Sequence, residues 1–568
     1  MRIDRLKSRG RQLGYVLLSE MVRKSCPLIF MQRGYREAVA EEKKLRWLHG
    51  LLCWRSPQER FHKNTNRVGK AAPAHTALKS KKIRKEIKKG DAMFANFTQI
   101  TPRMRVLSDS QIKEIHLGAC DILERTGSLI HNEEARNLLY SHGAVVENNG
   151  LVRIPSYLVD RALNTVPERF VLCDRDGNRA YRMETGKTHF SPLVDNIDII
   201  DPQTRQRRKF VAADAARMAK IMDYTRHMDV VQVGAFAADL PPEIVDRVNI
   251  REMMLHQRKA ISFSPSGPDA LLDVIEMASI IAGGREQLKM NPYMMKLGEP
   301  ISPLVHDDHA IKELMICAEH RMPIVYYPIP MGGATAPATS AGLLAQSHAE
   351  SLAGLVIHQL TNPGAPFLYG GVATVMDMKS TVCVYGGPEL YLQCAALSDI
   401  ATYFHLPFWG TAGCTDTKAL DTQGAAEIGM SCLLAVLTGA NLVHDVALLD
   451  QASLVDPTTV LFCDEVIDHV KHFMRGIQVT DETLAIDVID SVGAGGNYLI
   501  QKHTLQNFRS FWQPTYFTRP AMGVSEAHDL IKALNEKVID IEENYEVPPL
   551  DPDKVAALQE LEKKWLKG

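Results

Sequence analysis

The stretch Ile324-Val-Tyr-Tyr-Pro-Ile-Pro330, followed directly by Met331-Gly-Gly-Ala-Thr-Ala-Pro337, decides the fold of this chain. Its first part is a β-branched and aromatic run of strand length, which the glycine pair then breaks. An alanine- and leucine-rich helix is predicted over Ala338–Leu360, and a second apolar run follows at Phe367–Gly371. This order predicts two parallel strands, because parallel neighbours need a crossover that covers the sheet.

The same unit recurs along the chain, with helices predicted over Pro388–Phe404 and Ala425–Thr438. In all, the apolar runs of strand length are His189–Leu193, Asp229–Ala235, Ala260–Ser264, Tyr293–Gly298, Ile324–Ile329, Pro366–Gly371, Pro407–Thr411 and Asn441–Val446. Eight strands alternating with helices predict an α/β fold of the (β/α)8 barrel type. A doubly wound open sheet is the weaker alternative, because no Gly-x-Gly-x-x-Gly follows the first strand.

We expect four parts in the chain. Residues 1–92 contain 24 Lys and Arg but only 8 Asp and Glu, which predicts a basic extension that is disordered or non-native, with a nucleic-acid arm as the alternative. The codons for Lys88–Ala92 can hold a ribosome-binding sequence, so for a bacterial or archaeal source we expect translation to begin at Met93. Residues 93–185 are predicted as an α+β module packed on the barrel, and 186–450 as the barrel. Residues 451–568 are predicted as a helical extension that serves as a lid or a partner dock.

The composition is that of a globular enzyme, with 45% apolar and 23% charged residues among 568. No apolar run is long enough to span a membrane, so we expect no membrane partner. The ten cysteines show no repeated spacing and no secretory segment precedes them, which predicts reduced thiols in the cytoplasm. The rest of the chain is acidic, and we expect no nucleic acid as its partner.

Candidate catalytic residues follow from the barrel, because its reactive groups project from the C-terminal ends of the strands. Glu299 and Asp445 are the best candidates, since an ionised group beside a barrel interior is expected to have either a charged partner or a catalytic function. His444 could form an acid–base pair with Asp445. Neighbouring residues on a strand point to opposite faces, so we expect only one of these two to face the interior.

Aromatic residues also gather at these strand ends, and aromatic faces with a carboxylate suit a cation that has no hydrogen to donate. The candidate substrate-binding residues are Phe190, Phe236, Tyr369, Trp409, Gly332, Gly413 and Cys414. The alternative for each ring is a place in the barrel core or on the side of the strand that faces a helix. Cys414 could also be a nucleophile, but it has no CxxC or nearby histidine, so we predict no metal site. The loop after the eighth strand lacks the glycines and cation of a phosphate site.

Several motifs resemble the trimethylamine:corrinoid methyltransferase family, in particular its members that lack pyrrolysine and act on quaternary amines such as glycine betaine. The matching stretches are Arg105–Ile112, Gly298–Pro303, Pro330–Pro337, Asn362–Pro366, Gly410–Lys418, Gly439–Asp445 and His503–Leu505. They run in order from about Met93 to the C-terminus, and we expect residues 1–92 to fall outside the resemblance.

The resemblance implies a (β/α)8 barrel that moves a methyl group from an amine to the cobalt of a corrinoid (cobalamin) carried by a partner protein, with no cofactor held tightly by this chain. A small quaternary or tertiary amine is the implied substrate, and a homo-oligomer is left open. The sequence contains no pyrrolysine, which argues against trimethylamine itself. Two alternatives remain: a barrel lyase or isomerase with a carboxylate base, and a non-catalytic protein that binds quaternary amines.

Overall fold

The computed structural model describes residues 102–192, 196–232, 236–521 and 527–565. The predicted basic extension at 1–92 lies outside the described residues.

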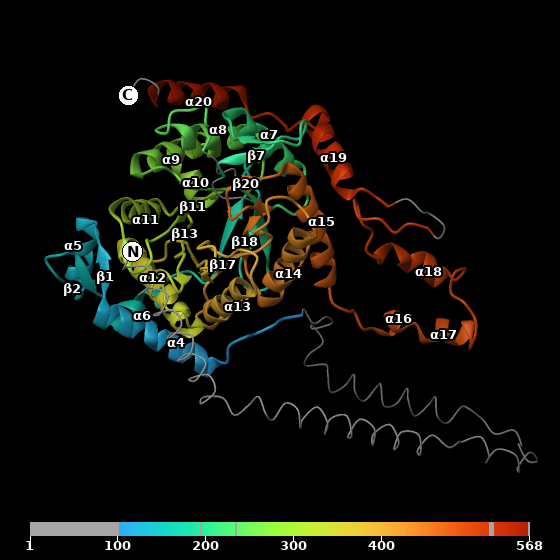
Figure 1. Ribbon diagram of the computed structural model, residues 1–568, viewed down its shortest axis with the longest axis horizontal. Helices are drawn as coiled ribbons and strands as arrows, with labels where there is room; N and C mark the ends of the chain where they lie inside the picture. Colours follow the sequence, from blue (N-terminus) through green and yellow to red (C-terminus); the bar gives the residue numbers. More distant parts are fainter. Residues whose placement is uncertain (1–101, 193–195, 233–235, 522–526, 566–568) are drawn as a thin grey trace, which may run out of the picture. The chain divides into compact units, whose positions relative to one another are not determined.

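Eight parallel strands form the centre of the fold (Figure 1). They are β6 (His189–Pro192), β9 (Val230–Val231), β10 (Ala260–Phe263), β11 (Met294–Gly298), β13 (Ile324–Tyr326), β15 (Phe367–Gly370), β17 (Phe408–Thr411) and β18 (Leu442–Val446). From β9 onward each strand pairs with the next in the chain, and β18 pairs back onto β6. A parallel bridge from Phe190 to Met228, just before β9, closes the ring. The predicted (β/α)8 barrel and all eight of its strands are therefore confirmed.

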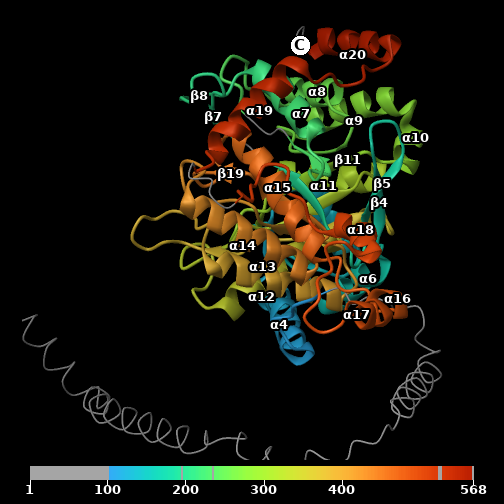
Figure 2. The same cartoon turned by 90° about the vertical axis from the view of Figure 1, so that its right-hand side faces the viewer.

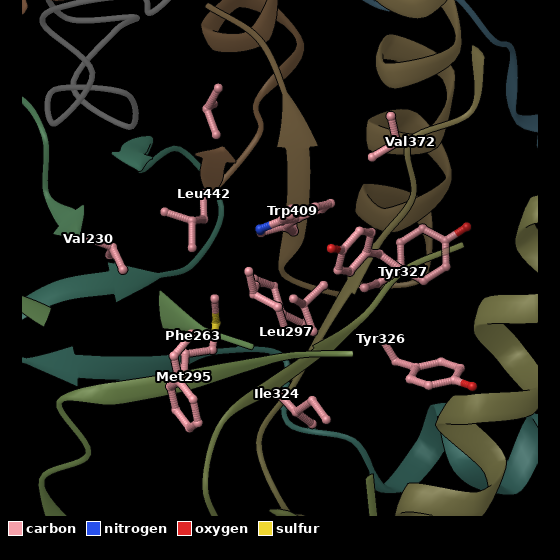
Figure 3. Close-up of a cluster of buried hydrophobic side chains, with 14 of the residues drawn as sticks. Val230, Phe263, Met295, Leu297, Ile324, Tyr326, Tyr327, Val372, Trp409 and Leu442 are labelled. Atoms are coloured by element: carbon pink, nitrogen blue, oxygen red, sulfur yellow. The ribbon is translucent and has the colours of Figure 1, made fainter. Parts of the chain in front are cut away.

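The barrel strands are almost entirely buried, as expected when helices cover a parallel sheet. Figure 3 shows a cluster of buried hydrophobic side chains from the barrel strands, among them Val230, Phe263, Met295, Ile324 and Leu442. The main outer helices, in chain order, are α7 (Ala212–Tyr224), α8 (Val245–His256), α9 (Pro268–Ala282), α11 (Asp308–His320), α12 (Ser340–Thr361), α13 (Pro388–Tyr403), α14 (Thr422–Thr438) and α15 (Pro457–Phe473). A short helix, α10 (Arg285–Met290), follows α9.

The segment before the barrel packs on α12 through its helices α4 (Asp109–Asp121), α5 (Glu133–Ser141) and α6 (Ser156–Thr165). Ser108 caps α4 and forms a capping box with Gln111. A short π-helix, η2 (Ile122–Thr126), continues α4 and is followed by Gly127. The Asn149-Gly150 pair lies in the turn of a hairpin formed by β2 (Val145–Val146) and β3 (Leu151–Arg153). Strand β1 (Ser128–Ile130) joins this hairpin to β12 (Val305–His306), which lies in the loop after β11.

The structure also contains short strands outside the barrel, which the sequence did not predict. They are the hairpin β4 (Phe170–Cys173) with β5 (Arg179–Met183), the pair β14 (Met331–Gly332) with β16 (Thr374–Val375), and the sheet of β7 (Asp198–Ile200), β8 (Arg207–Lys209), β19 (Leu448–Leu449) and β20 (Leu454–Val455). Most belong to loops that follow barrel strands. Two to five residues of strand in a loop give too weak a sequence pattern to recognise.

The chain after α15 divides into two parts. Short helices come first, namely α16 (Asp481–Leu484), α17 (Ile486–Val492) and α18 (Lys502–Asn507), then the turn η3 (Phe508–Ser510). Longer helices follow, with α19 (Leu530–Asn544) against α15 and α7, and α20 (Pro552–Trp565) against α9. Figure 1 shows α16 to α18 outside the ring of helices that surrounds the barrel, and Figure 2 views the molecule from that side. Among the helices of the described residues, none is long and apolar enough to cross a membrane.

Candidate active site at the barrel mouth

A cavity of about 450 Å³ lies at the C-terminal ends of the barrel strands. Its walls come from the loop after β10, from β11 and Glu299, from Tyr327 after β13, from Val372 after β15, and from β18. The volume is within the range of small-molecule sites, roughly 300–1,000 Å³. The three candidate catalytic residues, Glu299, His444 and Asp445, all line it.

His444 and Asp445 reach the cavity together, and the expectation that only one of them would do so is wrong. Asp445 has a positive φ of 66°, and the pairing of β18 with β6 shifts register between Val443 and Val446. The strand alternation is therefore interrupted where it would have sent one side chain outward. His444 Nε2 lies 2.9 Å from Asp445 Oδ1, so the imidazole N–H donates to the carboxylate. Both side chains are buried.

Aromatic rings support this pair from below. The Trp409 ring lies against the His444 ring with centroids 3.4 Å apart, and Tyr327 lies 4.1 Å from Trp409. Trp409 is fully buried beneath His444, whereas Tyr327 reaches the cavity wall. Figure 3 shows Tyr327 and Trp409 side by side. Of the two, Tyr327 has a face that a ligand could contact, and Trp409 fixes the imidazole.

Tyr385 is the second tyrosine of the cavity. Its backbone N–H and that of Gly386 donate to the Asp416 carboxylate at 2.8 and 2.9 Å, which holds the loop in place. Burial, reinforced by the nearby carboxylates of Asp445 and Glu299, raises the pKa of the Tyr385 phenol well above its usual value. The ring therefore remains a neutral phenol beside two carboxylates.

Lys296 and Glu313 form an ion pair in the cavity wall that the sequence analysis missed. Lys296 is in the middle of β11 and Glu313 on α11; both are about 95% buried, and their N–O distance is 2.5 Å. A Cβ at Gly298 would lie 2.8 Å from the Lys296 ammonium, so glycine leaves the room that this side chain occupies. A lysine inside the apolar run Tyr293–Gly298 was the available signal, because buried lysines are rare unless paired.

The rim of the cavity is acidic. Glu299 is exposed, and Asp307 accepts hydrogen bonds from the N–H groups of His309 and Ala310 at the start of α11. Glu350, buried on α12, accepts from Ser302 Oγ at 2.7 Å and so fixes the loop that carries Glu299. The cavity lining also contains the Asp445 and Glu313 carboxylates, and its one lysine is Lys296. The lining therefore has more carboxylates than ammonium groups, and this negative charge favours a cation as ligand.

None of the seven candidate substrate-binding residues lines this cavity: six lie elsewhere, and the seventh, Trp409, lies beneath it. Phe236, in the loop after β9, is 59% exposed. Phe190 is buried in β6, and Lys471 lies over its ring at 5.6 Å. Tyr369 points away from the barrel interior, toward α12, where its hydroxyl lies 2.8 Å from His348 Nδ1. Its place is in the packing between strand and helix, which was the alternative for each of these rings.

The remaining three candidates serve the backbone or the core. Gly332 pairs β14 with β16. Gly413 has a φ of 76° and donates its N–H to Ser431 Oγ at 2.9 Å, so it makes a turn that a larger residue would strain. Cys414 is fully buried, and burial together with the Asp445 charge raises the pKa of its thiol well above the usual value. A protonated thiol is a poor nucleophile.

No metal site is evident in the part of the chain that the structure describes, since no three His, Cys, Asp or Glu side chains there are arranged to hold one ion.

A closed (β/α)8 barrel with titratable groups and a cavity at the C-terminal ends of its strands has the architecture of a barrel enzyme. The family model of trimethylamine methyltransferase (MTTB) matches residues 76–565. The chain therefore belongs to the trimethylamine methyltransferase family. The match begins at residue 76, ahead of Met93, so the expectation that all of 1–92 lies outside the family was wrong.

Two relatives show the level of similarity. The chain is 33% identical over 454 residues to the trimethylamine methyltransferase MttB of Desulfitobacterium hafniense (strain DSM 10664 / DCB-2), which covers 79% of this chain and 91% of that protein. It is 30% identical over 469 residues to the glycine betaine methyltransferase of Desulfitobacterium hafniense (strain Y51), covering 81% and 97%. The solved Methanosarcina barkeri monomethylamine methyltransferase (MtmB) aligns over 82% of this chain and 97% of its own, at 14% identity and a TM-score of 0.40.

Proposed function

We propose that this protein transfers a methyl group from a small quaternary or tertiary amine, such as glycine betaine, to the cobalt of a corrinoid that a partner protein carries. The observation that carries the proposal is the cavity itself, which combines the Tyr327 and Tyr385 rings with the carboxylates of Glu299 and Asp445. Membership of the methyltransferase family supports it.

The cavity chemistry suits a methylated ammonium. Such a cation has few hydrogens or none to donate, so it binds through aromatic faces and through unspecific attraction to carboxylates. Tyr327 and Tyr385 supply the faces, and Asp445 supplies a buried negative charge that the His444 N–H holds in place. A neutral phenol at Tyr385 keeps its ring available without adding a charge.

Methyl transfer from a quaternary amine does not require a general acid or base from this chain. A methyl group that leaves a quaternary nitrogen leaves a neutral amine behind, so no proton needs to move in that step. The protein must hold the amine with one methyl directed outward and exclude water around it. We assign that orienting role to Asp445, His444 and the two tyrosines, with Glu299 at the rim attracting the cation.

The side chains exposed around the cavity mouth suit the docking of a partner protein that carries the cofactor. Corrinoid cobalt in its reduced form supplies the nucleophile that accepts the methyl group. Exposed apolar side chains lie in the loops after three barrel strands, namely Phe236 after β9, Ile301 after β11 and Met378 after β15. These would contact the partner protein, and Glu299 is exposed at the opening where the cofactor must approach.

We place glycine betaine or a similar betaine ahead of trimethylamine. The sequence contains no pyrrolysine, and one similar relative is a glycine betaine methyltransferase. We also place the reaction in the cytoplasm, since the eight cysteines that the structure describes are free thiols, as suits a reducing compartment.

The test is a cobalamin spectrum. The full chain is mixed with Co(I) cobalamin, free or protein-bound, and with glycine betaine, carnitine or trimethylamine, and the loss of the Co(I) absorption is followed. We expect the loss to be fast with a betaine, slow with trimethylamine and absent without protein. Fastest loss with trimethylamine would contradict the substrate assignment. Amine turnover without any corrinoid would contradict the mechanism and favour a lyase or isomerase.

A further inference from the structure

The end of β18 and the turn after it, residues 445–452, have an unusual backbone conformation; we call this segment the β18 loop. Eleven non-glycine residues in the described part of the chain have a positive φ, and five of them fall in these eight positions: Asp445, Ala447, Asp450, Gln451 and Ala452. A residue with a Cβ is disfavoured in the left-handed region, and it persists there only where its surroundings enforce it. The β18 loop therefore depends on contacts with other elements for its shape.

Both ends of the β18 loop reach the candidate active site. Asp445, at its start, and Ala452, at its end, line the cavity. Between them the chain forms β19, which pairs with β20, so it leaves the cavity wall and then returns to it. The direction in which the Asp445 carboxylate points is therefore tied to the shape of the whole loop.

Backbone hydrogen bonds fix one side of the β18 loop to the segment after β17. The Ala447 N–H donates to the Gly413 carbonyl at 2.8 Å, and the Asp450 N–H donates to the Thr417 carbonyl at 2.7 Å. These bonds hold the main chain of the loop. The side chain of Asp450 makes a further attachment to a different element.

That attachment is an ion pair with Arg207, at the start of β8. Arg207 Nη1 lies 2.6 Å from Asp450 Oδ2, and Arg207 Nη2 lies 2.6 Å from Asp198 Oδ2 on β7. The Asp450 and Asp198 side chains are only 14% and 11% exposed. Exposed single ion pairs add little, but a guanidinium fork between two largely buried carboxylates forms a network of defined geometry. Arg207 thus fastens the β18 loop to the β7–β8 hairpin.

We infer that Arg207 is a positioning residue for the candidate active site. By holding Asp450, it keeps the β18 loop in the strained conformation that presents the Asp445 carboxylate to the cavity. Without the guanidinium, Asp450 and Asp198 would repel each other, and the loop would relax away from β7. The inference rests on the proposed function, because Asp445 is assigned there to attract the substrate cation.

The experiment measures the affinity of the full chain for glycine betaine by calorimetry. We expect Arg207→Met to weaken binding about three- to tenfold, as is usual for residues coupled in one charge network. Arg207→Lys keeps the charge but not the fork, so its affinity should fall between that of Arg207→Met and that of wild type. Lys209→Met is the matched control: among the described carboxylates, Lys209 pairs with Asp198 at 2.9 Å and not with Asp450. It should bind as wild type does.

A second variant guards against misfolding of Arg207→Met. Asp450→Asn removes the same ion pair, and asparagine tolerates a positive φ at least as well as aspartate, so the strain of the loop is not increased. We expect it to reproduce the loss of affinity of Arg207→Met. Wild-type affinity in both variants would overturn the inference.

A double-mutant cycle shows whether Arg207 acts through Asp445. In the Asp445→Asn background, Arg207→Met should cause no further loss of affinity, because the charge that it positions is already absent. A loss as large as in the wild-type background would show that Arg207 acts independently of Asp445, and the inference would then be wrong.

Hydrogen exchange gives a readout that needs no amine. The Ala447 and Asp450 amides should exchange faster in Arg207→Met than in wild type, whereas the amides of β13 should not change. Unchanged exchange in the β18 loop would also contradict the inference. If the wild-type chain binds no betaine, the proposed function fails, and hydrogen exchange still tests the role of Arg207.

Discussion

Asp445 occupies a backbone position that aspartate adopts only occasionally. Its φ of 66° is in the left-handed region, where a residue with a Cβ is strained by about 1–2 kcal/mol. The alternation of a regular strand would have turned either His444 or Asp445 away from the cavity. The local conformation instead presents both, with their hydrogen bond facing the site. Residues in strained conformations are often found at functional sites, and this one lies in the cavity wall.

The two acidic candidates should contribute differently to substrate binding. Asp445→Asn removes a buried charge, and we expect the affinity for a quaternary amine to fall at least tenfold, about 1.4 kcal/mol or more. Glu299→Gln removes an exposed charge that water screens, so we expect less than about 1 kcal/mol. Calorimetric titration with glycine betaine measures both. An equal effect of the two substitutions would contradict the assignment of the buried charge as the principal one.

Cys414 should be dispensable for turnover. Because burial keeps its thiol protonated, we expect Cys414→Ala to retain the wild-type rate of methyl transfer within about twofold and to react with thiol reagents no differently from wild type in the folded state. Rate assays and thiol titration check this. A loss of a hundredfold or more in rate, with the thermal transition unchanged, would show that the thiol takes part in the chemistry.

At the scale of elements, the ion pair between β11 and α11 ties strand to helix beside the cavity. Glu313→Gln would leave the Lys296 ammonium buried without its counter-charge, which costs about 3–5 kcal/mol. Replacing both, by Lys296→Met with Glu313→Leu, should recover most of that stability. Urea unfolding of the two variants makes the comparison. If Glu313→Gln is as stable as wild type, the ion pair between Lys296 and Glu313 does not stabilise the folded protein.

Strand β12 adds a pH dependence to the same region. Burial lowers the pKa of His306 to about 4, and its Nδ1 lies 2.9 Å from the Tyr326 hydroxyl. The unfolded chain binds the proton first as the pH falls, so stability is lost between pH 6.5 and 4, at up to about 1.4 kcal/mol for each pH unit. Unfolding of wild type and His306→Gln at pH 7 and pH 5 tests this. The variant should lose less stability than wild type over that interval; an identical loss would contradict it.

The elements also show where sequence patterns are sufficient. The eight barrel strands were predictable because each is a buried apolar run bounded by turns. Lys296 was inside one of those runs, yet its contact with Glu313 depends on how α11 packs, which no local pattern contains. The same holds for Tyr369, whose partner His348 is on another element. The position of Glu299, His444 and Asp445 at one cavity was predictable because the ends of barrel strands converge, which is a property of the fold rather than of the residues.

At the scale of the whole molecule, the described chain is attached to the barrel from its first residues. Arg103 Nη2 donates to Thr402 Oγ1 at 2.8 Å, and the N–H groups of Val106 and Leu107 donate to the buried Asp399 carboxylate. These contacts join the start of α4 to α13. A truncated chain that still contains residues 103–107 can make these contacts, which attach the N-terminal module to α13.

We therefore expect that a chain beginning at Met93 folds and turns over as the full chain does. A chain beginning at Thr76, where the family match starts, is the matched comparison and should behave identically. A chain beginning at Gln111 lacks the Asp399 contacts and the Ser108 cap and should lose stability by several kcal/mol. Thermal unfolding and the cobalamin assay test all three. Aggregation of the Met93 chain beside a stable Thr76 chain would show that residues 76–92 are required.

The two ends of the barrel differ in a way that has an evolutionary consequence. The cavity lies at the C-terminal ends of the strands, whereas Lys471, near the end of α15, contacts Asp229, just before β9, at the opposite end. Substitutions that change which amine is bound would fall beside the cavity. After a gene duplication, one copy could therefore acquire a new substrate while the surface that follows α15 stayed unchanged.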